Sequence, residues 1–326
     1  MPFVLTARHL EVLLDMPEVI TAVEQAFREL YRGSCVTPQR LALEVHDHRG
    51  MLLLMPSYLG ESGALGTKIV SVYGENPKRG IPTVIATYLL CEADTGRPMA
   101  IMDGTYLTAI RTAATSAVAT KYLARKDSQT LGVFGAGVQG RFHLWALLSV
   151  LPIREVRVYD PKAENVQKFA KELSERHRIS IIIASRPQEV VNGSDVIVTA
   201  TTSPVPVFDG RDLHPGTHIN AIGAFTPETR EVDSEAVLRS QVVVDSYQGA
   251  WAEAGDVLIP LKEGKITKDH IYAELAEVVA GAKEGRRSPE QITLFKSVGL
   301  AIEDTATAKL AYDKALQKGR GQVISL

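Results

Sequence analysis

The sequence predicts an α/β fold in which helices cover both faces of a parallel sheet, accompanied by a second domain that mixes strands and helices. Three observations carry this prediction. The chain has 326 residues, which suits about two domains of ordinary size. From residue 130 onward, apolar runs of strand length alternate with runs of helix length. Between residues 38 and 90 the runs are short and turn residues separate them.

The first domain begins with helical periodicity. Between Leu10 and Tyr31 apolar residues recur at steps of three and four, interrupted at Pro17, which predicts one or two amphipathic helices. Strand-like runs follow at residues 41–45, 51–55, 68–72 and 83–90, separated by Gly, Pro, Asn and Asp. An antiparallel or mixed sheet is their simplest arrangement. The Ala-rich stretch 112–123 predicts a helix that leads into the second domain.

The second domain alternates strands and helices, which is typical of a doubly wound parallel sheet. Strands are expected at residues 130–134, 155–159, 179–184, 196–201, 218–222 and 242–245, about six in all. Helices are expected at residues 138–150, 163–175, 272–283 and 300–317. The last helix follows a completed sheet, so we expect it to return and pack on the N-terminal sheet.

A glycine-rich turn, with the sequence GAGVQG, lies between the first strand and the first helix of this parallel sheet. Gly135 can form a tight turn, Gly137 lets the backbone approach a pyrophosphate, and Gly140 lets the helix pack closely on the strand. The helix N-terminus offers free N–H groups and a partial positive charge to phosphates. In this context the motif predicts a Rossmann domain that binds a dinucleotide, and a glycine turn without a nucleotide is the less favoured interpretation.

The next predicted strand ends at Asp160, twenty residues after Gly140. A carboxylate at this position binds the ribose hydroxyls, and its charge opposes a 2′-phosphate. The sequence therefore favours NAD(H) as the cofactor. Lys162 follows two residues later and keeps NADP(H) as the alternative.

Composition excludes several classes of partner. The 36 Lys and Arg residues nearly balance the 38 Asp and Glu residues, which leaves a formal charge of −2. No global field therefore favours nucleic acid or an anionic membrane surface. The N-terminal segment lacks a basic stretch followed by an apolar run, and nothing later approaches 18 consecutive apolar residues. We expect a cytoplasmic protein that binds a small molecule.

Metal and nucleophile chemistry have little support in the sequence. His46 and His48 would share one face of a strand, but no third ligand is near, so no metal site is expected. Cys35 and Cys91 have no neighbouring cysteine and are expected to be reduced thiols. No GxSxG context surrounds the serines considered as nucleophiles, which are Ser57, Ser71 and Ser116.

Three basic residues of the first domain, Arg40, Lys68 and Arg111, lie beside predicted strands or turns. Taken singly, each is more often a solvated surface charge than a ligand-binding group. Their spacing alone does not group them.

Six motifs resemble the ornithine cyclodeaminase/mu-crystallin family over nearly the whole chain. They are GIPT at 80–83, DTGRPMAIMD at 94–103, TAIRTAA at 108–114, GAGVQ at 135–139, HINAIG at 218–223 and FKSVGLAIED at 295–304. The resemblance implies an NAD(P)-dependent oxidoreductase that forms a homodimer. It also implies a substrate-binding and dimerisation domain of α+β type at 1–120 together with 306–326, and a Rossmann dinucleotide-binding domain at 121–305.

The resemblance assigns roles to individual residues. Arg40, Lys68 and Arg111 match positions around the substrate carboxylate and are the catalytic candidates. With the three glycines, the expected cofactor contacts are Thr83, Arg111, Val138, Gln139, Asp160, Thr201, Ala221, Ile222 and Ser297. Val298 matches a position beside the nicotinamide and the substrate. Met55, Tyr73 and Phe225 are expected to shape the substrate pocket.

The physical chemistry of these residue types agrees with the implied roles. Arg and Lys donors form charge-assisted bonds with a carboxylate, and this fixes the neighbouring carbon for hydride transfer. Lys68 is the expected proton donor or acceptor, because two nearby guanidinium groups would lower its pKa.

One departure from the family pattern bears on the reaction. In the cyclodeaminase and alanine dehydrogenase branches an Asp that handles the substrate amine stands two residues after the Ile-Gly pair, and here Phe225 stands there. Phenylalanine cannot accept a proton, although Glu228 or Glu231 could be an imperfect substitute. The residues that follow are closer to the ketimine-reducing branch. We therefore rank imine reduction above deaminating cyclisation.

The favoured function is NAD(P)H-dependent reduction of a cyclic ketimine carboxylate, Δ1-pyrroline-2-carboxylate or Δ1-piperideine-2-carboxylate, to L-proline or L-pipecolate. Ornithine cyclodeaminase and NAD-dependent alanine dehydrogenase are the alternatives within the family. A non-catalytic, nucleotide-dependent binding protein of mu-crystallin type is the alternative from another class, and the three retained cations argue against it. A homodimer is also expected because the first sheet would otherwise leave open edges.

Overall fold

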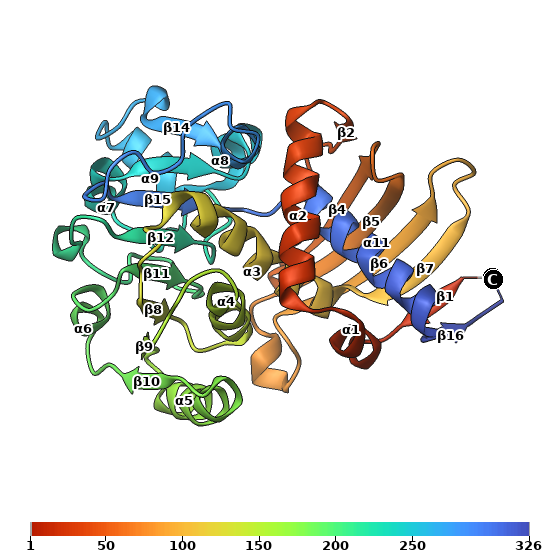
Figure 1. Ribbon diagram of the computed structural model, residues 1–326, viewed down its shortest axis with the longest axis horizontal. Helices are drawn as coiled ribbons and strands as arrows, with labels where there is room; N and C mark the ends of the chain where they lie inside the picture. Colours follow the sequence, from red (N-terminus) through yellow and green to blue (C-terminus); the bar gives the residue numbers. More distant parts are fainter. Residues whose placement is uncertain (1, 326) are drawn as a thin grey trace. The chain divides into compact units, whose positions relative to one another are not determined.

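The structure is a computed structural model that describes residues 2–325 (Figure 1). Its contacts divide the chain into two compact units. Unit 1 holds the chain up to Thr115 and again from Leu300 onward, and unit 2 spans Ser116–Gly299. The boundaries expected from the sequence lie within about six residues of these positions. The roles that were expected for the two parts stay predictions.

Unit 1 is built on one mixed sheet with the strand order β16-β1-β7-β6-β5-β4-β2, and β3 also pairs with β4. The β1–β7 pair is parallel and the other pairs are antiparallel, which confirms the expected antiparallel or mixed sheet. The strands are β1 (Phe3–Leu5), β2 (Cys35–Val36), β3 (Leu41–Val45), β4 (Gly50–Leu59), β5 (Ala64–Tyr73), β6 (Val84–Glu92), β7 (Pro98–Asp103) and β16 (Gln322–Val323). Four of these strands, β1, β2, β7 and β16, were not expected from the sequence.

Two long helices, α2 (Met16–Tyr31) and α11 (Ala301–Lys318), pack against each other, and α11 also packs across β4, β5 and β6 (Figure 1). A short helix, α1 (Ala7–Leu13), precedes α2. Pro17 lies in the first turn of α2, where a missing N–H costs nothing, so the two helices separate there. The return of the last helix to the N-terminal sheet is therefore confirmed.

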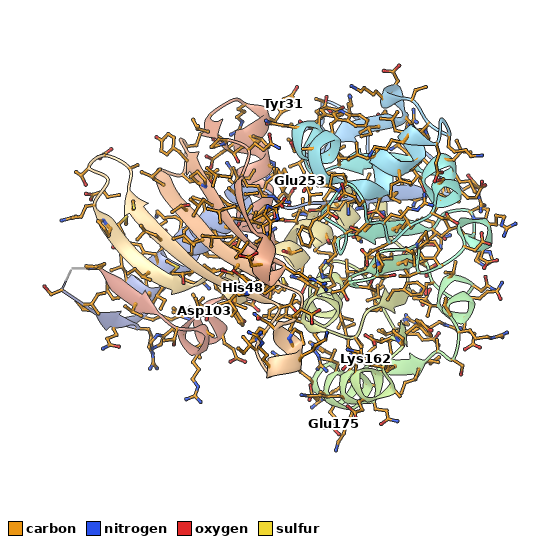
Figure 2. The ribbon with its side chains drawn as sticks, turned by 180° about the vertical axis from the view of Figure 1, so that it is seen from behind. Tyr31, His48, Asp103, Lys162, Glu175 and Glu253 are labelled. Carbon is orange, nitrogen blue, oxygen red and sulfur yellow. The ribbon has the colours of Figure 1, made fainter. Side chains whose placement is uncertain are left out.

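The other face of this sheet is rich in apolar side chains. Figure 2 shows it with the strands in front and α11 behind them. The register places Leu43, Leu52, Ser71 and Ile85 in one row across β3, β4, β5 and β6. Ile85 is 45% exposed and Leu43 is 52% exposed. The face opposite α11 therefore presents an apolar surface, which we call the open face.

A 20-residue helix, α3 (Gly104–Leu123), begins in unit 1 and continues into unit 2. It starts eight residues before the expected helix at 112–123. The Asp103 carboxylate accepts a hydrogen bond from the Tyr106 N–H at 2.7 Å, which satisfies a free donor of the first turn. The early start places Arg111 inside the helix rather than in the turn before it.

Unit 2 contains a parallel sheet with the strand order β10-β9-β8-β11-β12-β15-β13-β14. The strands are β8 (Thr130–Phe134), β9 (Glu155–Tyr159), β10 (Ser180–Ile183), β11 (Val196–Thr199), β12 (His218–Ala221), β13 (Gln241–Val244), β14 (Ile271–Glu274) and β15 (Thr293–Lys296). The order runs outward in both directions from β8, so a switch point lies at its carboxyl end. This is the arrangement expected of a Rossmann sheet.

The helices of unit 2 besides α3 are α4 (Val138–Leu148), α5 (Ala163–His177), α6 (Pro187–Val191), α7 (Ser234–Arg239), α8 (Tyr247–Glu253), α9 (Gly255–Lys262) and α10 (Leu275–Val279). The expected helix at 272–283 is wrong in its first part, because Ile271–Glu274 pairs with β13 as an edge strand. Only α10 is helical there. The sheet gains β14 and β15 beyond the six strands expected, since short apolar runs do not distinguish strand from helix.

The helices in the described part of the chain include none that combines the length and apolar character required to cross a membrane. The cytoplasmic location expected from the sequence stays a prediction.

Candidate active site

The glycine turn connects β8 to α4 at the switch point of the parallel sheet. Gly135 has a φ of +98°, a left-handed conformation that glycine adopts without strain. A Cβ on Gly135 would overlap the carbonyl oxygen of Ala200, and a Cβ on Gly140 would overlap that of Gly135. These two glycines therefore allow the tight turn and the close packing of α4.

The first turn of α4 has room for a phosphate. A Cβ on Gly137 would meet no atom within 4 Å, in contrast to the crowding at its two neighbours in the motif. The side-chain oxygen of Gln139 is buried, and no described residue donates a hydrogen bond to it. Val138, which opens the helix, is 60% exposed. An open glycine at a helix N-terminus fits the pyrophosphate of NAD(H), and the contact itself stays a prediction.

Asp160 follows β9 directly and supports the glycine turn. Its Oδ2 accepts a hydrogen bond from the Ala136 N–H at 3.0 Å, and its Oδ1 accepts one from the Lys162 N–H at 2.9 Å. Lys162, labelled in Figure 2, caps the start of α5. The carboxylate thus lies beside the turn, and its expected contact with the ribose hydroxyls stays a prediction.

In unit 1, β5, α3 and α11 bring four charged side chains together. The Nζ of Lys68 donates to Oδ2 of Asp304 at 2.7 Å. The Nε of Arg111 donates to Oδ1 of Asp304 at 3.0 Å, and its Nη1 donates to Oε2 of Glu303 at 2.5 Å. Each of the four residues is at most 5% exposed. We call this group the ion cluster, and its two positive and two negative charges balance.

Both cations of the ion cluster were expected from the family resemblance, and neither carboxylate was. Glu303 and Asp304 stand in the first turn of α11, where acidic residues commonly favour the helix dipole. Because the helix dipole already explains acids at this position, it gives no indication that they also pair with Lys68 and Arg111. The available signal was the sequence AIEDTATA at 301–308, in which small and apolar residues surround the two acids, a pattern typical of a buried helix.

The pKa of Lys68 is lowered to about 8, as expected in direction but for a different main reason. Desolvation by burial is the largest cause, followed by the positive charge of Arg111. The carboxylates of Asp304 and Glu303 act in the opposite direction and raise it. The explanation by two guanidinium groups is therefore wrong in part, since burial and one guanidinium account for the lowering.

Arg40 enters the first sheet near this cluster. It precedes β3, whose first residue, Leu41, pairs with Leu54. The next residue of β4, Met55, pairs with Lys68. Arg40 is the residue directly before the one that pairs with Leu54, and it is half-buried.

Thr83 lies in the segment before β6, and its carbonyl oxygen accepts a hydrogen bond from the Tyr73 N–H at 2.9 Å. The expected cofactor and pocket residues of unit 2 gather at the carboxyl ends of β11, β12 and β15. They are Thr201, Ala221, Ile222, Phe225, Ser297 and Val298. Open α/β sheets bind their ligands at this edge.

Glu231, considered above as a substitute base, is fully buried and holds two of these strand ends together. Its Oε1 accepts hydrogen bonds from the N–H of Thr201 at 2.6 Å and from its hydroxyl at 2.8 Å. Its Oε2 accepts from the Gly223 N–H at 2.6 Å and the Thr199 hydroxyl at 2.9 Å. Burial is the main reason why the pKa of Glu231 is raised, and the charge of Asp256 adds to it. The substitute role is therefore wrong for Glu231, while Glu228 is exposed.

Two further carboxylates of unit 2 organise neighbouring loops. Asp256 accepts hydrogen bonds from the Glu231 N–H at 2.7 Å and forms a buried ion pair with Lys296 at 2.8 Å. The Oδ2 of Asp245 accepts from the Ser297 hydroxyl at 2.9 Å and from the Val298 N–H at 2.7 Å. Buried carboxylates thus fix the loop that carries Ser297 and Val298.

The weak candidates of the sequence have other roles. His46–His48 forms a 3₁₀ helix, η1, so its histidines do not share a strand face as assumed. Within residues 2–325, no three potential ligands among His, Cys, Asp and Glu gather as a metal site. Ser57 bonds to Thr305, and Ser116 to His143. Both cysteines are free, and burial raises the pKa of Cys35 to about 12, which keeps that thiol unreactive.

The chain is similar to proteins of known family over nearly its full length. The profile of the ornithine cyclodeaminase/mu-crystallin family matches residues 1–319. The structure of a Thermococcus litoralis Δ(1)-pyrroline-2-carboxylate reductase in complex with NADH and L-proline superposes with a TM-score of 0.97, at 51% identity over 99% of this chain and 100% of that one. An archaeal alanine dehydrogenase dimer with bound NAD superposes with a TM-score of 0.93, at 40% identity over 99% of both chains.

A Δ(1)-pyrroline-2-carboxylate reductase of Bacillus cereus is 38% identical over 322 residues, which cover 98% of this chain and 99% of that protein. Profile, sequence and structure agree over nearly the full length. The chain belongs to the ornithine cyclodeaminase/mu-crystallin family.

Proposed function

We propose that the protein is an NADH-dependent reductase that converts a cyclic ketimine carboxylate, first Δ1-pyrroline-2-carboxylate, to the corresponding cyclic amino acid. The observation that carries the proposal is the buried pair of Lys68 and Arg111, held by carboxylates in a chain that also has an open glycine turn for a dinucleotide. The similarity to a reductase solved with NADH and L-proline supports the same reaction.

The residues of unit 1 would act on the two ends of the substrate. Arg111 and Arg40 bind the carboxylate, because guanidinium groups offer several N–H donors in a plane. Lys68 donates a proton to the ring nitrogen, which makes C2 more electrophilic. Bound NADH supplies the hydride to C2, and the product is a secondary amine. An ammonium with a pKa of about 8 is still largely protonated at neutral pH, yet it gives up a proton more readily than an ordinary lysine.

Two other activities of the family are weaker candidates. Deamination of an amino acid requires a group that handles the substrate amine, and Phe225 provides none at the position where related enzymes carry Asp. Glu231 cannot replace it, because four hydrogen bonds already engage its carboxylate. Reductive amination of pyruvate stays the second candidate, since an alanine dehydrogenase shares 40% of the sequence.

NAD(H) is proposed as the preferred cofactor. The Gly137 turn would hold the pyrophosphate, with Val138, Gln139, Thr201, Ala221, Ile222 and Ser297 as the other contacts proposed for unit 2, and Thr83 and Arg111 as those proposed for unit 1. The negative charge of Asp160 beside this turn disfavours a 2′-phosphate.

A second copy of the chain is proposed to cover the open face of the first sheet. This face carries exposed apolar residues on adjacent strands, among them Leu43 and Ile85. Extended apolar surface of this kind usually marks an interface. The related alanine dehydrogenase structure is a dimer.

The proposed reaction predicts that the purified protein oxidises NADH when Δ1-pyrroline-2-carboxylate is added and forms L-proline. Absorbance at the NADH band and chiral analysis of the product measure both. Δ1-Piperideine-2-carboxylate, pyruvate with ammonia, and L-ornithine are assayed in parallel. Ammonia release from ornithine without imine reduction would overturn the proposal. Inactivity on all four substrates with intact NADH binding would favour a non-catalytic binding protein.

Replacing Lys68 by methionine removes the proposed proton donor and keeps most of the side-chain volume. We expect kcat/KM for the imine to fall about 100-fold or more, the usual contribution of general acid catalysis. NADH affinity, measured by fluorescence titration, should stay near that of the wild type. Lys171→Met on the exposed face of α5 is the matched control. Full activity of Lys68→Met would remove Lys68 from the mechanism.

Replacing Asp160 by serine removes the proposed charge barrier to NADPH and keeps a hydrogen-bond acceptor near Ala136. We expect the ratio of kcat/KM for NADH to that for NADPH to fall about tenfold, which corresponds to about 1.4 kcal/mol. Steady-state kinetics with both cofactors measure this ratio, and Glu164→Ser in the same region is the control. An unchanged ratio would contradict a role of Asp160 in cofactor choice.

The proposed dimer predicts sedimentation at twice the chain mass of 35.5 kDa at micromolar concentration. Lysine at both Ile69 and Ile85 would place two charges on the open face and should shift the protein toward the monomer. Val12→Lys, which alters an exposed apolar residue of α1, should leave the mass unchanged. A wild-type monomer would contradict the dimer.

A further inference from the structure

Asp304 is the centre of the ion cluster because both of its carboxylate oxygens are engaged by cations. Oδ2 accepts from the Lys68 ammonium at 2.7 Å, and Oδ1 accepts from the Arg111 Nε at 3.0 Å. Its side chain is fully buried. Glu303, the other carboxylate of the cluster, bonds to Arg111 and accepts from the Leu300 N–H.

The bridge connects three separate elements. Lys68 lies on β5, Arg111 on α3, and Asp304 in the first turn of α11. The side chain of an isolated lysine or arginine adopts many rotamers, and a charge-assisted contact restricts them. One buried carboxylate that receives both cations therefore fixes the separation between the ammonium and the guanidinium.

We propose that Asp304 is a positioning residue that holds the Lys68 ammonium and the Arg111 guanidinium at the separation required by a substrate with a carboxylate next to an imine carbon. This inference rests on the proposed imine reduction. It assigns Asp304 a task in the reaction although Asp304 itself does not contact the substrate.

The bridge also affects the proton on Lys68. The charged groups that act on Lys68 are Asp304 and Glu303 on α11 and Arg111 on α3. Tyr88 pairs with Lys68 across β5 and β6, and its hydroxyl bonds to Thr305. Burial and Arg111 lower the pKa of Lys68, while Asp304 raises it. Without the Asp304 charge the pKa falls below its present value of about 8, so less of the acid form exists at neutral pH.

Asp304→Asn tests the inference through the pH profile of imine reduction. The protonated form of Lys68 is required, so kcat/KM declines as pH rises through the Lys68 pKa. We expect this decline to begin about 1 to 3 pH units lower in Asp304→Asn than in the wild type, the usual effect of one neighbouring opposite charge. The substrate is the same in both measurements, so its own ionisation cancels.

Glu303→Gln is the matched comparison, because it removes a carboxylate of the same cluster that bonds to Arg111 and lies on the same helix turn as Asp304. We expect a higher KM for the imine and a decline displaced by less than about 0.5 pH unit. NADH titration and thermal unfolding show whether each variant is folded. A uniform loss of activity at every pH in folded Asp304→Asn, with the decline unmoved, would overturn the positioning role.

Asp304→Glu covers the case in which the asparagine variant does not fold. The charge is kept but the longer side chain displaces it, so we expect a lower kcat with the pH decline within about 0.5 unit of the wild type. An unchanged kcat would overturn the inference, because the position of the carboxylate would then not matter. Failure of the wild type to reduce any imine would instead reject the proposed function on which the inference rests.

Discussion

The ion cluster beneath the first sheet is the constraint on which unit 1 depends. Four charges lie at most 5% exposed, and burying an unpaired charge of this kind would be very costly. Each cation is therefore paired with a carboxylate, and both carboxylates come from the first turn of α11. Removing one partner of a buried pair typically costs about 3 to 5 kcal/mol. The last helix must return to the N-terminal sheet, because no cation of the cluster is satisfied without it.

Buried carboxylates also organise unit 2, where they accept hydrogen bonds from loop residues as well as pairing with cations. Glu231 accepts four hydrogen bonds from residues that follow or end β11 and β12. Asp245 does the same for the segment after β15. These segments contain the residues proposed to contact the cofactor. Loops at the carboxyl ends of strands are ordinarily mobile, and buried acceptors of this kind restrict them without occupying the ligand face.

Much of the fold could be predicted from local pattern. The strands β8 and β9 have the expected bounds, because each is an apolar run between clear turn residues. The predictions were wrong for elements whose conformation depends on tertiary contacts. Ile271–Glu274 is a strand because β13 offers a free edge, which the sequence does not reveal. The strands β1 and β16 have three and two residues and depend on their pairing with distant parts of unit 1.

The glycines of the candidate site were predictable from their motif and its cations only from the family resemblance, while its carboxylates were not expected. The role of Gly135 could be predicted because the glycine motif around it indicates a tight turn. The role of Asp304 depends on Arg111 and Lys68, which lie 193 and 236 residues away in the chain. The lowered pKa of Lys68 was attributed to two guanidinium groups, because burial cannot be estimated from the sequence. Desolvation, the main cause of the lowered Lys68 pKa, becomes visible only when the helix and the sheet are assembled.

The balance of charge within the cluster explains how a protein with a formal charge of −2 can be suited to a carboxylate substrate. Lys68 and Arg111 are already neutralised by Asp304 and Glu303, so the cluster has little net field with which to attract anions in general. The cluster still offers N–H groups in fixed directions, because each cation has more N–H donors than its carboxylate partners accept. In the proposed reaction, recognition therefore depends on N–H groups whose positions are fixed, and a nonspecific anion gains little from the same site. Asp304 thus contributes selectivity by the same contacts that make the buried charges tolerable.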